Sequence, residues 1–148
     1  MDSRPFRSPT TAELLRDAFR WFADGVEVRS AEAGQPELSP GAAVTMSYLG
    51  EEAISPSALA RRMQVSRQRI HVVVRELAAA GMVRVEPDPN SARDKLIRTT
   101  PAGRRRQRRV IDALGDLDQR AASVIGEDEL ARLRELLVQV ASISRATS

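Results

Sequence analysis

The segment that most constrains the fold of this chain covers residues 54–83 and predicts two helices joined by a tight turn. Ser55 followed by Pro56 indicates a helix start, because serine caps the first turn and proline lacks only an N–H that has no partner there. Ser66 caps the second helix, and Gly81 stands where a residue with positive φ ends it. The apolar residues of the second helix follow the helical repeat and predict one buried face: Ile70, Val73, Val74 and Leu77. We therefore predict a helix-turn-helix.

The opposite face of the second helix is basic and polar, with Arg67, Gln68, Arg69, His71 and Arg75. A helix that buries one side and presents guanidinium and amide groups on the other suits the major groove of DNA. An ordinary helical hairpin with a solvated basic face carries the same charges, so the remaining segments have to decide between the two.

Charge is distributed unevenly along the chain. Residues 54–110 hold 14 Arg and Lys against 4 Asp and Glu, a net charge of +10, and the rest holds 9 basic and 16 acidic residues, or −7, which together give the net charge of +3. A surface that binds a polyanion needs its positive charge concentrated in this way. The pattern favours DNA binding by the central segment.

Several kinds of chemistry are disfavoured by the composition. The chain has no cysteine and only one histidine, His71, and it has no glycine-rich phosphate loop. Thiolate nucleophiles are thereby excluded, and a zinc site or a Ser-His-Asp triad is disfavoured. We predict no catalytic residue, no metal site, no cofactor and no enzymatic activity. No apolar run approaches the roughly 18 residues of a membrane span, and the first residues lack an apolar signal core, so we expect a cytoplasmic protein.

The segments before the helix-turn-helix predict a tail and two helices. Residues 1–9 are expected to be a disordered tail, in which Arg4 and Arg7 are the only candidates for a minor-groove arm. Thr10 and Glu13 fit a capping box that opens a helix extending toward Ala31. After a loop with Gly34 and Pro36, a second Ser-Pro pair opens a helix over residues 40–48.

Two strands follow the helix-turn-helix. Residues 82–85 and 95–99 have the β-branched, alternating character of strands, and the turn-rich residues 87–94 connect them into a hairpin, or wing. Arg93 near its tip is suited to a minor groove, where a narrow A·T tract concentrates negative potential. Solvation of this arginine is the alternative.

The last part of the chain predicts two long helices. Thr100 caps the first of them, and its first turns hold arginines at positions 104–106, 108 and 109. Positive charge is poorly placed at a helix N-terminus, so phosphates or partner carboxylates are expected to offset it. Gly126 breaks the chain before a final helix with an apolar stripe.

Two passages resemble the MarR family of bacterial transcription regulators. LARRMQVSRQRIHVVVRELAAAGMV is similar to the family's helix-turn-helix pattern, and VRVEPDPNSARDKLIRTTPAG to its wing and the helix start after it. The resemblance covers about Thr11 to Ser144. It implies a homodimer held by the terminal helices, with two winged modules on one duplex. Family members are often repressors that small phenolic or other lipophilic ligands release, and the pocket usually lies where the dimerisation helices meet the DNA-binding module.

The sequence departs from the family pattern at two places. Family wings commonly carry Asp-Arg/Lys-Arg near the tip, whereas this chain has Ser91-Ala92-Arg93, with Asp94 as the substitute carboxylate. The recognition helix has Val72 where a basic or polar residue is frequent, which suggests contact with a thymine methyl group. Both departures concern the target sequence and not the fold.

The predicted fold is mainly α (α+β), a winged helix-turn-helix with a two-stranded wing. We expect a disordered tail over residues 1–9, dimerisation helices over residues 10–37 and 101–148, and a DNA-binding module over residues 38–100. The predicted DNA contacts are Ser55, Ser57, Arg61, Ser66, Arg67, Gln68, Arg69, His71, Val72, Arg75, Arg93 and Lys95. The predicted dimer interface is Leu15, Phe19, Val110, Leu114, Leu117, Leu133, Leu137 and Val140. The predicted ligand pocket is Phe19, Phe22, Met46 and Tyr48.

The sequence thus predicts a homodimeric, sequence-specific regulator that binds double-stranded DNA and responds to a small-molecule effector. Two other functions stay open. A winged helix that serves as an adaptor binds a protein partner and not DNA, and a ligand-binding or catalytic module uses the dimer pocket. Failure to bind any duplex at low salt favours the adaptor, and turnover in a substrate screen favours the catalytic module.

Overall fold

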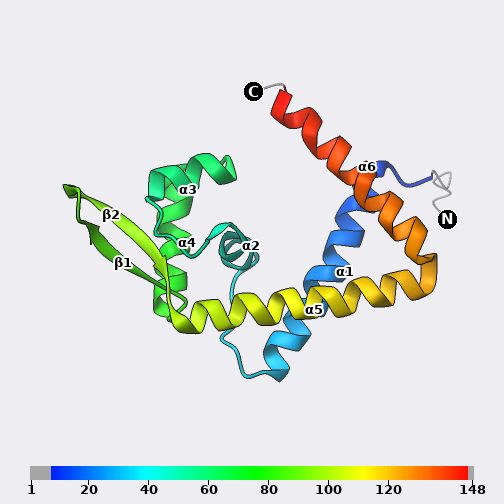
Figure 1. Cartoon of the computed structure of the whole chain (residues 1–148), viewed down its shortest axis with the longest axis horizontal. Helices are drawn as coiled ribbons and strands as arrows, with labels where there is room; N and C mark the ends of the chain where they lie inside the picture. The colour runs from blue at the N-terminus through cyan, green and yellow to red at the C-terminus, as the bar shows by residue number, and fades with distance from the viewer. Residues whose placement is uncertain (1–7, 147–148) are drawn as a thin grey trace, which may run out of the picture. The chain divides into compact units, whose positions relative to one another are not determined.

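The computed structural model describes residues 8–146 and is mainly α-helical, with one antiparallel hairpin (Figure 1). The predicted fold class is confirmed. The elements are α1 (Thr11–Glu32), α2 (Pro40–Tyr48), α3 (Pro56–Met63), α4 (Arg67–Ala79), β1 (Val83–Asp88), β2 (Ser91–Thr99), α5 (Pro101–Ile125) and α6 (Glu127–Ala146). Across these residues, no helix combines the length and the apolar character that spanning a bilayer requires. The predicted tail, with Arg4 and Arg7, lies outside the described residues except for residues 8 and 9.

The chain forms two compact units. One unit comprises Val26–Ile111 and the other Met1–Gly25 with Asp112–Ser148, so both boundaries fall inside long helices, α1 and α5. The first unit is called the winged module below, and the second the terminal unit. The domain bounds given above remain a prediction.

The core of the winged module lies where α2, α3, α4 and the hairpin meet. The largest fully buried side chains there are Leu59, Ile70, Leu77, Ile97 and Thr45. The cluster around them includes Val73 and Val74, so the predicted inner face of the second helix is the buried one. Burial of these aliphatic side chains supplies the main stabilising term, at roughly 25 cal/mol per Å².

Helix starts and stops follow the local chemistry of the sequence. The side chains of Ser39, Ser55 and Ser66 each accept a hydrogen bond from the backbone three residues on. The turn between α3 and α4 has Gln64 in the left-handed region, at φ 55°, and Gly81 follows α4 at φ 72°. The predicted stop of the second helix at Gly81 is confirmed.

The hairpin is longer than predicted. Pairing continues past Pro87 to Asp88 opposite Ser91, with a register shift between Pro87 and Asp88, so the prediction of a connection over residues 87–94 was wrong. Proline is tolerated here because a two-stranded sheet has a free edge, on which no N–H is needed. The short turn is closed by its own side chains, since Asp88 accepts from Asn90 N at 2.8 Å and Asp94 from Ser91 Oγ at 2.8 Å.

The start of α5 is fastened to the end of α4. Thr100 Oγ1 lies 2.6 Å from the carbonyl oxygen of Gly81, to which it donates, and accepts from Gly103 N at 3.0 Å. Gly103 packs directly against the carbonyl oxygen of Met82, leaving no room for a Cβ. A glycine is therefore required at this crossing.

The terminal unit exposes much apolar surface. Leu117 of α5 is buried, at 3% exposure, against Gly25 of α1. Trp21 packs edge-on against Phe22 and lies under the guanidinium of Arg120, 5.9 Å from the ring centroid. Other large apolar side chains of this unit remain exposed, and among them Phe19 has 63% of its surface accessible.

Candidate nucleic-acid interface

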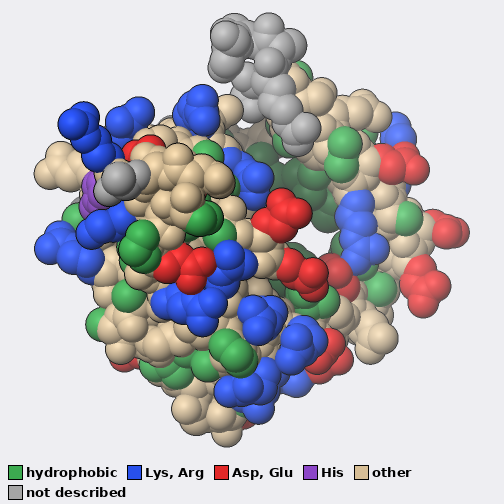
Figure 2. Space-filling view, turned by 60° about the vertical axis from the view of Figure 1, so that its left-hand side comes forward, with side chains coloured by type: hydrophobic (Ala, Val, Ile, Leu, Met, Phe, Trp, Pro, Cys, Tyr) green, Lys and Arg blue, Asp and Glu red, His purple; other side chains and the backbone are tan. Residues whose placement is uncertain are grey.

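Helix α4 presents a basic face that no other part of the winged module covers. Arg67, Gln68, His71 and Arg75 are exposed, and Val72 between them is 52% exposed. On the face shown in Figure 2, the single histidine is bordered by Lys and Arg side chains. Within residues 8–146, no hydrogen bond or ion pair engages these side chains, so their donors are available to an outside partner. These five residues of the predicted recognition set lie together on one face of α4.

Two of the predicted polar contacts are also helix caps. Ser55 Oγ accepts from Ala58 N at 3.1 Å, and Ser66 Oγ accepts from Arg69 N at 3.2 Å. Each hydroxyl keeps its own hydrogen for an acceptor such as a phosphate oxygen. Ser57 is half-buried in the first turn of α3, and Arg61 is exposed on the last turn.

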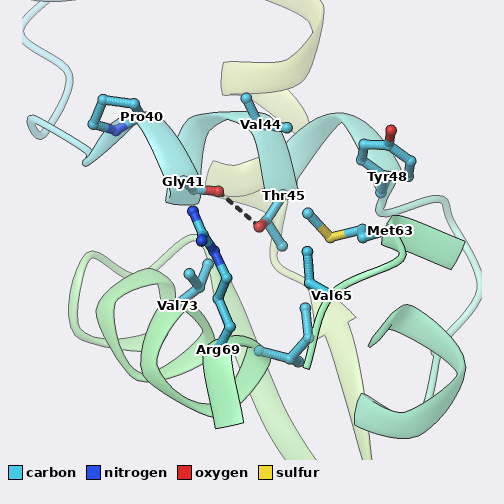
Figure 3. A pocket seen from close by; sticks show the side chains of 10 residues that line it. Pro40, Gly41, Val44, Thr45, Tyr48, Met63, Val65, Arg69 and Val73 are labelled. Carbon is cyan, nitrogen blue, oxygen red and sulfur yellow. Dashed lines mark hydrogen bonds between the residues drawn. The ribbon is translucent and has the colours of Figure 1, made fainter. Parts of the chain in front are cut away.

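Arg69 lies apart from the other arginines of α4. Its side chain lines a groove of about 390 Å³ between α2 and α4, and Figure 3 shows its guanidinium beside Gly41 at the start of α2. The remaining walls of the groove are mostly apolar, with the side chains of Tyr48 and Thr45 as its hydroxyl groups. Thr45 Oγ1 is already used, because it donates to the carbonyl oxygen of Gly41 at 2.7 Å. Sequence reasoning did not identify this groove.

The hairpin holds three exposed basic side chains, Arg84, Arg93 and Lys95, of which Arg84 pairs with Glu86. Asp94, the substitute carboxylate, accepts from Ser91 and has no hydrogen bond to Arg93. Nearer the base of the hairpin, Glu86 binds Arg98 Nε at 2.7 Å and Arg84 Nε at 3.0 Å. The hydrogen bond from Arg98 is the main reason why the pKa of Glu86 is lowered, and desolvation opposes it. Arg93 and Lys95 are therefore the hairpin cations that stay free for a partner.

Comparison with known proteins agrees with the winged-helix fold described above. Residues 37–94 match the model of the MarR family. The winged helix of this chain is therefore similar to that of the MarR family. Comparison with curated proteins gave no match.

Solved structures of MarR-family regulators share the fold of nearly the whole chain. MarR of Escherichia coli without ligand is 19% identical over 90% of this chain and 98% of its own, with a TM-score of 0.69. The regulator BldR of Sulfolobus solfataricus is 25% identical over 87% of this chain and 90% of its own, with a TM-score of 0.64. A MepR mutant of Staphylococcus aureus, bound to an oligodeoxyribonucleotide, is 16% identical over 91% of this chain and 98% of its own, with a TM-score of 0.60. Regulators of the MarR family are transcription factors and not enzymes.

The arginine cluster of α5 divides into two groups. Arg104 donates to the carbonyl oxygen of Thr99 at 2.9 Å, and Arg106, only 6% exposed, donates to Pro36 O at 2.9 Å. Burial lowers the pKa of Arg106 and the charge of Glu27 partly opposes this. Arg105, Arg108 and Arg109 are exposed. Part of the predicted phosphate cluster thus holds the winged module together from inside.

The predicted pocket and interface residues lie in both units. Met46 is buried in the core of the winged module and Tyr48 lines its groove, whereas Phe19 and Phe22 belong to the terminal unit. Of the predicted interface, Leu117 is buried within the chain and Val110 is half-buried. The other six are exposed or nearly half-exposed: Leu15, Phe19, Leu114, Leu133, Leu137 and Val140. Among the described residues, no cluster of three or more His, Asp or Glu is able to hold a metal ion.

Proposed function

We propose that this chain is a cytoplasmic, sequence-specific transcriptional regulator that binds double-stranded DNA as a homodimer and represses from a pseudo-palindromic operator. The observation that carries the proposal is the exposed face of α4, where guanidinium, amide and imidazole groups have no partner within the described chain. The buried row behind them, from Ile70 to Leu77, holds the face outward. The MepR mutant, which shares the fold and is bound to an oligodeoxyribonucleotide, supports DNA binding by this chain.

The side chains of α4 and its neighbouring elements suit different parts of a duplex. Arg67 and Arg69 are proposed to bind guanine O6 and N7, Gln68 adenine or a phosphate, and Val72 a thymine methyl group. Ser55, Ser57 and Arg61 are proposed to bind phosphates, and Arg93 the minor groove beside the site. His71, Arg75, Ser66 and Lys95 complete the proposed surface.

Dimerisation is proposed from the uncovered apolar side chains of the terminal unit. α6 exposes Leu133, Leu137 and Val140 along one stripe, and α1 exposes Leu15 and Phe19. Exposed apolar area of this extent is uncommon on a monomer, and two-fold pairing with a second copy would bury it. The two recognition helices would then read half-sites about one helical turn apart, roughly 34 Å.

Release by a small lipophilic or phenolic effector is the last part of the proposal. Of the four residues predicted to line its pocket, Tyr48 lines the groove between α2 and α4, where its hydroxyl can orient a guest. An effector acts only if it binds the DNA-free form more tightly than the DNA-bound form. The proposal is therefore tested by adding phenolic compounds to the preformed complex and measuring DNA release.

Selection of bound duplexes from a random pool tests the DNA-binding part directly. Purified protein without ligand should enrich a palindromic sequence. If each protomer neutralises about four phosphates, log affinity plotted against log salt should have a slope near −7. Failure to bind any duplex at low salt would overturn the proposal and favour the adaptor function. Enrichment without palindromic symmetry would overturn the homodimeric arrangement.

A further inference from the structure

α5 is joined to the helix-turn-helix at two separate places. The first is the end of α4, where Thr100 Oγ1 donates to Gly81 O and the backbone N–H of Thr100 donates to Met82 O at 3.0 Å. Gly103 lies against Met82 at the same point. One attachment of this kind fixes where α5 starts, but it leaves the direction of α5 relative to α4 free to vary.

The second attachment reaches α4 through α2. Adjacent residues of α5 bind the two ends of this short helix. Arg106 donates to Pro36 O at 2.9 Å and to Gln35 Oε1 at 3.3 Å, in the loop that leads into α2. Gln107 Nε2 donates to Met46 O at 2.7 Å and Leu49 O at 2.8 Å, at the end of α2. These carbonyl groups belong to the end of a helix, where backbone acceptors lack the usual helical partners, and Met46 O also accepts from Leu49 N at 3.3 Å.

α2 is in turn bound to the middle of α4. The carboxylate of Glu76 accepts from Ser39 N at 2.6 Å and from Ser39 Oγ at 2.7 Å, so one α4 side chain closes the start of α2. Gly41 packs on Val73 of the same helix, where a Cβ would lie 3.8 Å from Val73 Cγ2. α2 therefore has hydrogen bonds to α5 at its C-terminal end and to α4 at its N-cap residue.

We propose that α2 is a strut that sets the angle between α5 and the recognition helix α4, and that Gln107 is the positioning residue that fixes its far end. With Thr100 as a pivot and Gln107 as the second point, the angle between α4 and α5 is determined. Loss of the Gln107 bonds leaves the pivot and the Arg106 bonds intact but removes the fixed point at the end of α2, so the angle can vary. Because α4 carries the proposed DNA contacts, the effect on DNA rests on the proposed function.

Three variants at one position test the strut. Gln107→Glu keeps the size of the side chain but sets a carboxylate against two carbonyl oxygens at a helix C-terminus, which is unfavourable. Gln107→Lys restores donors to the same carbonyl oxygens. Gln107→Leu removes hydrogen bonding without adding charge. Since the chain has no cysteine, spin labels can be placed cleanly at Gln68→Cys in α4 and Arg109→Cys in α5.

The distance between the two labels is measured by pulsed electron resonance, without DNA and diluted with unlabelled chain. We expect a narrow distribution in the parent and in Gln107→Lys, and a broadened or shifted one in Gln107→Glu and Gln107→Leu, while circular dichroism shows unchanged helix content. Unchanged distributions in Gln107→Glu and Gln107→Leu would overturn the strut, and so would broadening in Gln107→Lys equal to that in Gln107→Glu.

The second measurement uses unlabelled protein and the selected duplex. Gln107→Glu and Gln107→Leu should lower affinity by about tenfold at a temperature well below unfolding, and Gln107→Lys should lie near the parent. Parent-like affinity in all three variants would overturn the link from the strut to DNA binding. If the parent itself binds no duplex, the proposed function fails, and the label distances alone decide the strut.

Discussion

Gly103 crosses the carbonyl oxygen of Met82 so closely that the two backbones are in contact. The crossing joins the first turn of α5 to the residue that follows the glycine stop of α4. It is one of the two attachments between α5 and the helix-turn-helix, and the space available there decides which residues are tolerated.

Gly103→Ala should therefore destabilise the protein. Alanine favours a helix by up to about 1 kcal/mol over glycine, but its methyl group would overlap Met82 O and the methyl group of Thr99, and overpacking typically costs about 1–3 kcal/mol. Urea unfolding at fixed protein concentration measures the net effect. The matched control is Gly115→Ala in the same helix, where nothing lies near the added Cβ and stability should rise or stay equal. A stable Gly103→Ala variant would contradict the crossing.

The ion pairs of Glu86 should make the hairpin sensitive to acid. Its pKa is lowered in the folded protein from the ordinary value of 4.5, chiefly by the hydrogen bond from Arg98. The associated stability is present above pH 4.5 and is lost as the pH falls through the lowered pKa. Glu86→Gln should remove this part of the acid dependence. Unfolding midpoints between about pH 3 and pH 6 should converge for the two proteins at the acid end and separate toward neutral pH, with the parent more stable. Parallel curves would contradict the prediction.

Arg69→Ala tests base reading by the recognition helix. If Arg69 binds guanine, the variant should lose affinity for the best site by about tenfold or more and should lose base preference at one position in each half-site. The groove location of its guanidinium makes this variant the most informative of the arginine series. Equal loss on every sequence would identify a phosphate contact instead. Arg67→Ala, from the exposed face of the same turn, is the comparison variant.

Val140→Glu tests the dimer. Val140 is 52% exposed in the chain, so a carboxylate there should not unfold the protomer, but it would be buried without a partner in a two-fold interface. Light scattering at micromolar concentration should give the mass of two chains for the parent and of one for the variant. Gln139→Glu adds the same charge at the neighbouring exposed position and should stay dimeric. A monomeric parent would refute the interface.

Local chemistry made the helices predictable. The cap at Thr10 with Glu13, the serines at positions 39, 55 and 66, and the glycine after α4 each act within a few residues, so their effect is visible in the sequence. The hairpin is longer than predicted because Pro87 and Asp88, which favour turns, continue the first strand. They pair with the second strand across a register shift.

Long-range side-chain contacts were not predictable. Arg106 reaches Pro36, 70 residues away, and Gln107 reaches Met46, 61 residues away. In the sequence, Arg106 looks the same as its exposed neighbours Arg105 and Arg108, because the helical repeat of this turn is polar on all sides. Only the packed structure separates the arginine that is buried from those that face solvent.

The turn of the hairpin depends on nothing beyond itself. Asp88 and Asp94 complete its hydrogen bonds from within, through Asn90 and Ser91. Residues there can be exchanged in the course of evolution while the rest of the module stays as it is. Under the proposed function, a lineage of such proteins would acquire new target sequences by changing a few codons at this tip, without having to rebuild the scaffold that carries it.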